Sequence, residues 1–148
     1  MDVVIDLVSH ILFSFCAGFL AWKVYGVQGR KSILLALAAA FVSGILIDLD
    51  HLLDYILAFG LHFDLYTFLY NQQFVVTRKN YVIFHGFEYI ALLGVSLWWA
   101  KKKQTKMILF ALLASMLFHL FVDMMIYAIP LKQYFLIYRI FNDFRMSH

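Results

Sequence analysis

Nine ionisable side chains lie inside stretches that are apolar enough to span a membrane. They come from four parts of the chain: His10; Asp48, Asp50, His51 and Asp54; His85 and Glu88; and His119 and Asp123. A charged side chain at the centre of a bilayer costs about 3 kcal/mol or more, so such residues usually face a protein interior or an aqueous cavity. Imidazole and carboxylate groups are also the natural ligands of divalent metal ions. The sequence therefore predicts that the functional site lies among these residues.

The composition is that of an integral membrane protein. Of the 148 residues, 64% are hydrophobic and 14% are charged, whereas soluble domains have about 45–50% and about 25%. The net charge of +3 is weak and dispersed, which argues against nucleic acid as a partner. The single cysteine, Cys16, excludes an internal disulfide. We expect one transmembrane domain that covers residues 1–148.

Four apolar stretches are long enough to cross the bilayer as helices, because about 20 residues at about 1.5 Å each cross a hydrocarbon core of about 30 Å. They cover residues of about 3–25, 32–59, 81–100 and 106–129. The segment 61–79 is too polar to span and is expected to lie on the membrane surface. Residues 131–148 alternate aromatic and basic side chains, which is typical of an interfacial amphipathic helix. The predicted fold is an all-α membrane four-helix bundle with these two additions.

Basic residues predict the orientation of the bundle. Seven of the twelve lysines and arginines fall in the connections after the first and third spans, and five fall on the opposite side. The positive-inside rule then places both termini and the segment 61–79 on the non-cytoplasmic side of the membrane. We expect this membrane to be a prokaryotic inner or plasma membrane. Because successive spans run in opposite directions, all nine ionisable residues fall in one outer layer, roughly 5–15 Å below the membrane surface. One shared site is the simplest explanation.

Helical spacing turns these side chains toward one another. At about 100° per residue, the four polar residues between 48 and 54 occupy an arc of roughly 160°. His119 and Asp123 are four residues apart, and His85 and Glu88 are three apart, so each pair shares a helix face. Ferritin-like bundles build carboxylate–histidine metal sites in the same way.

Charge balance favours a metal ion in this layer, since five carboxylates and four imidazoles share it without a lysine or arginine at that depth. One or two divalent ions would compensate the carboxylates. The ligand mixture fits zinc best, with manganese or iron as alternatives. Some residues also have simpler interpretations: His10 as a packed histidine, His51 and Asp54 as interfacial groups, and Glu88 as a group that orients a ligand.

Four short motifs follow one another along nearly the whole chain. They are Ser9-His10, Gly44-Ile45-Leu46-Ile47-Asp48-Leu49-Asp50-His51, Phe84-His85-Gly86, and Phe118-His119-Leu120-Phe121-Val122-Asp123. In this order they resemble the YdjM-like inner-membrane metal-dependent hydrolases and are more distantly similar to zinc-dependent phospholipase C. By motif position, the resemblance implies metal-ligand roles for His10, Asp48, Asp50, His85, His119 and Asp123.

Two positions depart from the pattern of that family. Ile47 stands where proline is usual, so the helix is expected to continue unbroken through Asp48. The third motif reads His85-Gly86-Phe87-Glu88 instead of two histidines flanking an Arg-Gly turn. This departure gives Glu88 the role of a missing ligand or of the general base.

The leading hypothesis is a membrane-embedded, metal-dependent hydrolase that cleaves a phosphoester or ester of a lipid at the outer leaflet. A catalytic metal lowers the pKa of bound water; Glu88 or Asp54 would act as acid and base, and His51 would support a ligand. Arg78 and Lys79 would hold an anionic headgroup. The expected partners are membrane lipid and, as an option, further copies of the chain.

Two other functions remain open. A cation or metal carrier would also need intramembrane carboxylates and histidines, but the cytoplasmic halves of the spans, such as 33–41 and 92–97, offer no polar relay. No inverted repeat supports a transporter either. A structural membrane protein stabilised by metal would have a closed ligand shell without room for substrate.

Overall fold

The structure is a computed structural model that describes residues 3–146, and within this range helices joined by short connections make up the fold, without a β-strand. The α-helices and 3₁₀ helices (η) are α1 (Val3–Tyr25), α2 (Arg30–Gly44), η1 (Leu46–Asp50), α3 (His51–Phe59), α4 (Leu65–Leu69), α5 (Gln72–Thr77), α6 (Phe87–Trp99), α7 (Lys103–Tyr127), η2 (Leu131–Tyr134) and α8 (Leu136–Phe141). The all-α prediction is therefore confirmed.

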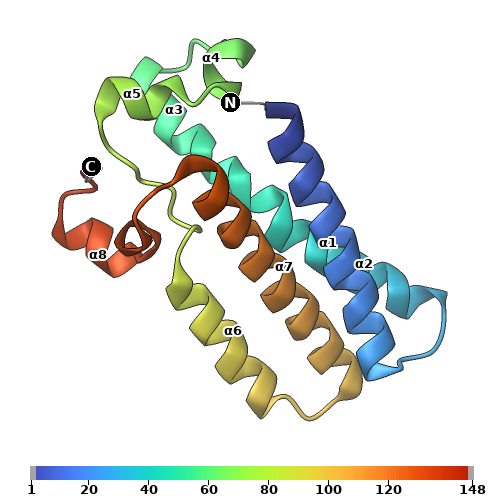
Figure 1. Cartoon of the computed structure of the whole chain (residues 1–148). Helices are drawn as coiled ribbons and strands as arrows, with labels where there is room; N and C mark the ends of the chain where they lie inside the picture. The colour runs from blue at the N-terminus through green and yellow to red at the C-terminus, as the bar shows by residue number, and fades with distance from the viewer. Residues whose placement is uncertain (1–2, 147–148) are drawn as a thin grey trace.

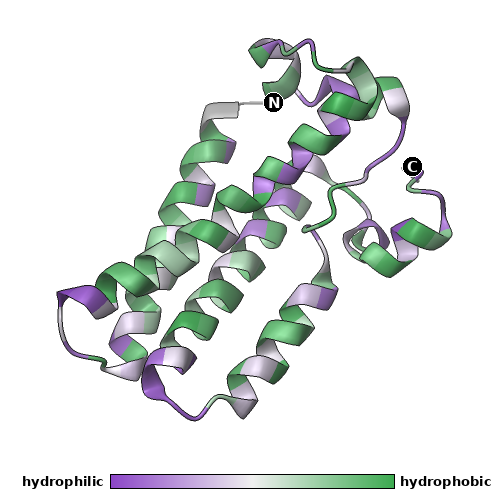
Figure 2. Cartoon of the chain, turned by 180° about the vertical axis from the view of Figure 1, so that it is seen from behind, coloured by the Kyte–Doolittle hydropathy of each residue, from purple (hydrophilic) through white to green (hydrophobic). Residues whose placement is uncertain are grey.

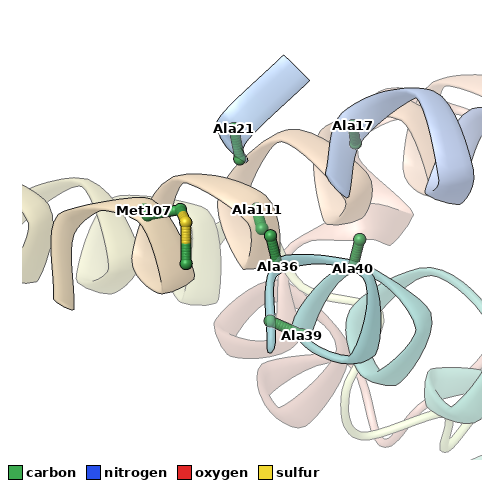
Figure 3. Packing of buried hydrophobic residues seen from close by; sticks show 7 residues of the cluster. All are labelled: Ala17, Ala21, Ala36, Ala39, Ala40, Met107 and Ala111. Atoms are coloured by element: carbon green, nitrogen blue, oxygen red, sulfur yellow. The ribbon is translucent and has the colours of Figure 1, made fainter. Parts of the chain in front are cut away.

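Three long helices form the centre of the molecule. α1, α2 and α7 pack against one another, and α6 lies along the side of α7 (Figure 1). Small side chains fill the contact between the three: Ala17, Ala21, Ala36, Ala39, Ala40 and Ala111, with Met107 beside them (Figure 3). Small residues let helix backbones approach closely, which is the usual way that helices associate in lipid. At Gly18 a Cβ atom would lie 2.9 Å from the Cα of Leu37, so this approach requires glycine.

The membrane character of the chain is confirmed by three helical stretches that are long and apolar enough to cross a bilayer, Ile5–Tyr25, Arg30–Phe59 and Lys103–Tyr127. The fourth expected span, 81–100, is helical only in α6. Its 13 residues extend about 20 Å, which is shorter than the hydrocarbon core of about 30 Å. The helix starts late because residues 81–86 are held in a non-helical conformation by groups of the site described below.

The connections divide between two ends of the bundle. The start of α1, the α4–α5 segment and α8 lie at one end, and the connections 26–29 and 100–102 lie at the other (Figure 1). Figure 2 shows hydrophilic residues at both ends of the bundle. It also shows some within the bundle, in the half that is nearer to α4 and α5. The expected amphipathic helix at 131–148 consists, in the described residues, of η2 and the short α8. Arg139 of α8 points inward and is fully buried, while Phe141 is 85% exposed.

Candidate metal centre

The second long helix is interrupted at the level of the site. α2 ends at Gly44, and the chain tightens into η1, where the Asp48 N–H bonds to the Ile45 carbonyl. The prediction of an unbroken helix through Asp48 was therefore wrong. A Cβ atom at Gly44 would overlap the hydroxyl oxygens of Ser14 and Ser115, so the side chains of these two serines of α1 and α7 occupy the space where a Cβ would lie.

The interruption frees a backbone carbonyl to orient a histidine. In a continuous α-helix the Gly44 carbonyl would accept the Asp48 N–H; here it lies 3.0 Å from Nδ1 of His119. A Nδ1–H donated to this carbonyl fixes the ring and leaves Nε2 as the free nitrogen, the arrangement found in metal-ligating histidines. His119 is 1% exposed, and its Nε2 points to the centre of the cluster.

Four ligand atoms converge at this point from three separate parts of the chain. Nε2 of His85 lies 3.0 Å from Nε2 of His119, and the two nitrogens lie 3.2 and 3.3 Å from Oδ1 of Asp48. Oδ2 of Asp123 lies 3.3 Å from His119 Nε2 and 3.7 Å from His85 Nε2. Ligands at 2.0–2.1 Å from a tetrahedral zinc ion are separated by about 3.3 Å. Five of the six separations among these atoms are thus close to the ligand spacing around such an ion, and Asp48 and Asp123 each face both imidazole nitrogens.

The non-helical segment that carries His85 is held by two carboxylates. Asp54 accepts the N–H groups of Tyr81 and Val82 at 2.7 and 3.0 Å. Asp50 Oδ2 accepts the N–H of Phe84 at 2.7 Å and lies 3.2 Å from Nδ1 of His85. Buried backbone N–H groups need such partners. The carboxylates thus replace the helical hydrogen bonds, and Asp50 also orients the imidazole of His85.

The buried Arg139 holds the same segment from the other side. Its guanidinium donates to the carbonyls of Val82 and His85 at 2.6 and 3.0 Å and to Oδ1 of Asn80 at 3.5 Å. Burial lowers the pKa of Arg139, and the charges of nearby carboxylates, Asp50 first among them, act in the opposite direction. A guanidinium stays protonated in proteins even so. Arg139 therefore places a fixed positive charge behind the cluster.

A second group of ligand atoms adjoins the first. Nε2 of His10 lies 3.0 Å from Oδ1 of Asp6 and 3.2 Å from Oδ1 of Asp123. The His10 ring stacks on His119 with 4.1 Å between centroids. Tyr127 donates its hydroxyl to Oδ2 of Asp6 at 2.9 Å. Asp123 therefore faces both groups, with one oxygen turned toward each.

Two hollows adjoin the cluster. A cavity of about 500 Å³ lies over it, lined by cluster residues and by Asn71, Asn80, Tyr127 and Tyr134, with no lysine or arginine in its wall. The Tyr134 hydroxyl is buried and makes no hydrogen bond within the described residues. A groove of about 400 Å³ lies beside the cluster, between α2 and α6, and its wall is almost entirely apolar.

The profile of the YdjM inner membrane protein family matches residues 5–131. The chain belongs to this family. No curated protein and no solved structure matches it. The range matched by the YdjM profile includes every histidine and aspartate that could bind a metal ion in this cluster, His51 among them, and ends before Arg139.

In this YdjM family member, the structure brings together most of the residues expected at the site. His10, Asp48, His85, His119 and Asp123 contribute atoms to the two ligand groups. His51 lies beside them, with Nε2 3.6 Å from Oδ1 of Asp48 and its ring against His85. Asp50, expected as a ligand, contacts the Nδ1 side of His85 instead of sharing the central point.

Other expected residues lie in different surroundings. Asp54 bonds to the backbone as described, and Glu88 accepts the N–H groups of Leu136 and Ile137 at the start of α8. Lys79 donates to Asp143 at 2.9 Å; this hydrogen bond raises the pKa of Lys79 and lowers that of Asp143. Arg78 is exposed, and neither Arg78 nor Lys79 lines the cavity.

Sequence reasoning missed three groups at the site. Asp6 lies four residues before His10, a helical spacing that could have revealed it. Tyr127 lies four residues after Asp123. Arg139 lies in the segment 131–148, which was expected to form an interfacial amphipathic helix. Arg139 binds mainly backbone carbonyls, which leave no pattern in a sequence.

Proposed function

We propose that this protein is a membrane-embedded, metal-dependent hydrolase that cleaves a phosphoester or ester bond of a membrane lipid. The observation that carries the proposal is the convergence of buried histidine nitrogens and aspartate oxygens, 3.0–3.7 Å apart, at the base of a cavity of about 500 Å³. Zinc fits the nitrogen and oxygen donors best, with manganese or iron as alternatives.

The chain prepares its ligands before an ion binds. Asp50 and the Gly44 carbonyl occupy the Nδ1 atoms of His85 and His119, so both rings present Nε2 to the same point. Removal of hydrogen bonds that orient metal ligands in this way typically lowers metal affinity by about 10–100-fold. A divalent ion bound in this cluster with a coordination position open to the cavity would supply a Lewis acid and an activated water molecule.

Neutral hydrogen-bonding groups are assigned to the polar part of the substrate. Asn71, Asn80, Tyr127 and Tyr134 line the cavity, while Lys79 is engaged by Asp143. The unpartnered hydroxyl of Tyr134 is the group that we assign as a donor to a substrate oxygen, since buried hydroxyls normally have partners. This assignment replaces Arg78 and Lys79 as the headgroup contacts.

His51 is the group that we assign to proton transfer. It lines the cavity beside Asp48 and His85, and its Nε2 lies 3.6 Å from Oδ1 of Asp48. An imidazole can serve as acid or base near neutral pH. Asp54 and Glu88 are engaged by backbone N–H groups, so we assign them to positioning the chain.

A lipid substrate accounts for the apolar groove beside the centre. Ile47 and Phe84 form part of its wall, and each is next in sequence to a proposed ligand, Asp48 or His85. Leu92 and Met116 continue the wall along α6 and α7. An acyl chain in this groove would bring the ester region of the lipid to the level of the metal centre, and the proposed outer-leaflet location follows from the positive-inside rule.

The test is lipid hydrolysis by protein purified in nanodiscs, measured together with its metal content. Replacement of His119 or Asp123 with alanine should remove both the bound ion and the release of product from a panel of phospholipids and neutral glycerolipids. His62→Ala is the matched control, because His62 is exposed and lies outside the cavity. Full hydrolysis by metal-free protein would defeat the proposal.

The competing candidate is a structural membrane protein that metal stabilises. Four protein ligands around one ion form a closed shell, which is typical of structural zinc sites. This candidate predicts bound metal without hydrolysis of any lipid in the panel. A carrier is disfavoured by the buried alanine cluster between α1, α2 and α7, which contains no polar side chain that could relay an ion (Figure 3). Uptake of labelled Zn²⁺ by liposomes that contain the protein would support a carrier instead.

A further inference from the structure

We infer that the site holds two divalent ions, and that Asp6, His10 and Asp123 bind the second one with the Asp123 carboxylate as a bridge. The inference rests on the proposed metal centre and adds to it a ligand, Asp6, and an open coordination position. The second position is the one at which a substrate or water molecule has access to a metal.

The geometry of Asp123 divides the ligand atoms into two sets. Its Oδ2 lies near Nε2 of His119 and its Oδ1 lies near Nε2 of His10, at 3.3 and 3.2 Å. Oδ1 of Asp6 completes the second set at 3.0 Å from the same His10 nitrogen. Carboxylates that bridge two ions in this way occur in hydrolytic sites whose metals are about 3.5–4 Å apart.

The two proposed ion positions differ in the number of protein ligands that they offer. Asp48, His85, His119 and Asp123 would offer the first ion four protein ligands, which would leave it no position for water. The second set has three protein ligands, and catalytic zinc sites commonly pair three protein ligands with one open position. Asp6, His10 and Asp123 all line the cavity, so an open position there faces the space assigned to substrate.

Charge also favours two ions. The two sets together contain three carboxylates, Asp6, Asp48 and Asp123, and their histidines are neutral when they bind metal. The opposite charges of Asp50 and Arg139 beside the cluster cancel each other. One divalent ion leaves one negative charge uncompensated in a medium of low dielectric constant. Two divalent ions leave one positive charge, which an anionic ligand such as hydroxide or a phosphoester oxygen can neutralise.

Asp6 is built into its position from outside the cluster. Its Oδ2 accepts the Tyr127 hydroxyl, and Asn71 of the connection before α5 donates to that same hydroxyl oxygen at 3.3 Å. Its Oδ1 is buried and accepts no hydrogen bond of good geometry within the described residues. One oxygen is thus oriented by the protein while the other points at His10, as expected of an oriented metal ligand.

The experiment counts ions in the purified full chain. Protein in nanodiscs is stripped with chelator, loaded with Zn²⁺, freed of excess metal and measured by elemental analysis. We expect two equivalents in the wild type, one in Asp6→Asn and two in Asp64→Asn, a matched control because Asp64 is exposed at the start of α4. Loading with Mn²⁺ gives a second readout: an exchange-coupled paramagnetic resonance signal in the wild type and a single-ion signal in Asp6→Asn.

The outcomes separate this inference from the proposed function. One equivalent in both wild type and Asp6→Asn overturns the second position and leaves the proposed metal centre intact. If Asp6→Asn and Asp6→Ala both still bind two equivalents, Asp6 is not a metal ligand. If either variant binds no metal, Asp6 is needed for both ions and does not define a separate second site. If the wild type binds no metal, the proposed function itself is wrong.

Discussion

Replacement of Arg139 tests whether a residue of the C-terminal segment stabilises the proposed metal centre. Arg139→Met keeps most of the side-chain volume but removes the donors to the carbonyls of Val82 and His85. Hydrogen bonds to a charged group contribute about 1.5–3 kcal/mol each, and the 3.5 Å contact to Asn80 is too long to add much. The two short bonds therefore amount to about 3–6 kcal/mol, from which the desolvation of the buried guanidinium subtracts.

We expect Arg139→Met to lower the free energy of unfolding by about 2–4 kcal/mol, because it also leaves two buried carbonyls without a partner. Zn²⁺ affinity should fall by about 10–100-fold, since the backbone at His85 loses its support. The assays are thermal unfolding in detergent and titration of metal-free protein with Zn²⁺. Arg139→Lys should rescue little, because an ammonium group does not reproduce the fork that reaches both carbonyls.

Arg145→Met is the matched control, because the side chain of Arg145 is 78% exposed and its ion pair with Asp143 spans 3.7 Å. It should leave the unfolding temperature and the Zn²⁺ affinity unchanged. If Arg139→Met also leaves both the unfolding temperature and the Zn²⁺ affinity unchanged, the guanidinium does not stabilise the carbonyls of Val82 and His85, and the proposed role of Arg139 is wrong.

Three further results are expected. Gly44→Ala should destabilise the fold by about 1–3 kcal/mol, because a Cβ overlaps neighbouring helices there, whereas Gly94→Ala has open space and should be neutral or slightly stabilising in thermal unfolding. Tyr134→Phe should retain metal content while the rate of lipid hydrolysis falls about 10-fold or more, as for loss of one oriented donor; an unchanged rate removes Tyr134 from substrate binding. Asp143→Asn should cost a small amount of stability at neutral pH only: Lys79 lowers the pKa of Asp143, so the contribution is present above the unfolded-state pKa and is lost as pH falls through the folded-state value. A difference in unfolding temperature that persists in acid would contradict this sign.

The sequence was sufficient to predict the helical membrane fold and the core of the cluster. Alternating spans put His10, Asp48, His85, His119 and Asp123 at one depth, and helical phase directed the last two to one face. These arguments succeed because they depend on rise and rotation per residue, which are nearly constant along a helix. The family match over residues 5–131 agrees with the order of the motifs.

Sequence reasoning failed where the backbone leaves the helical path. The break after Gly44 depends on close contact with α1 and α7, and the late start of α6 depends on Asp50, Asp54 and Arg139. Each of these side chains bonds to main-chain groups, which are the same in every residue and carry no pattern. For the same reason the sequence did not reveal that Asp54 and Glu88, predicted as acid and base, accept hydrogen bonds from backbone N–H groups.

The central claim is that this chain hydrolyses a membrane lipid with a metal ion held by the convergent histidines and aspartates. The most direct measurement is product release from lipid vesicles as Zn²⁺ is titrated into metal-free protein. We expect a rate near zero without metal that rises with Zn²⁺ and saturates when the site is filled, with no rise in His119→Ala. A rate that does not respond to Zn²⁺, or Mn²⁺ or Fe²⁺ in its place, although the ion binds, would contradict it.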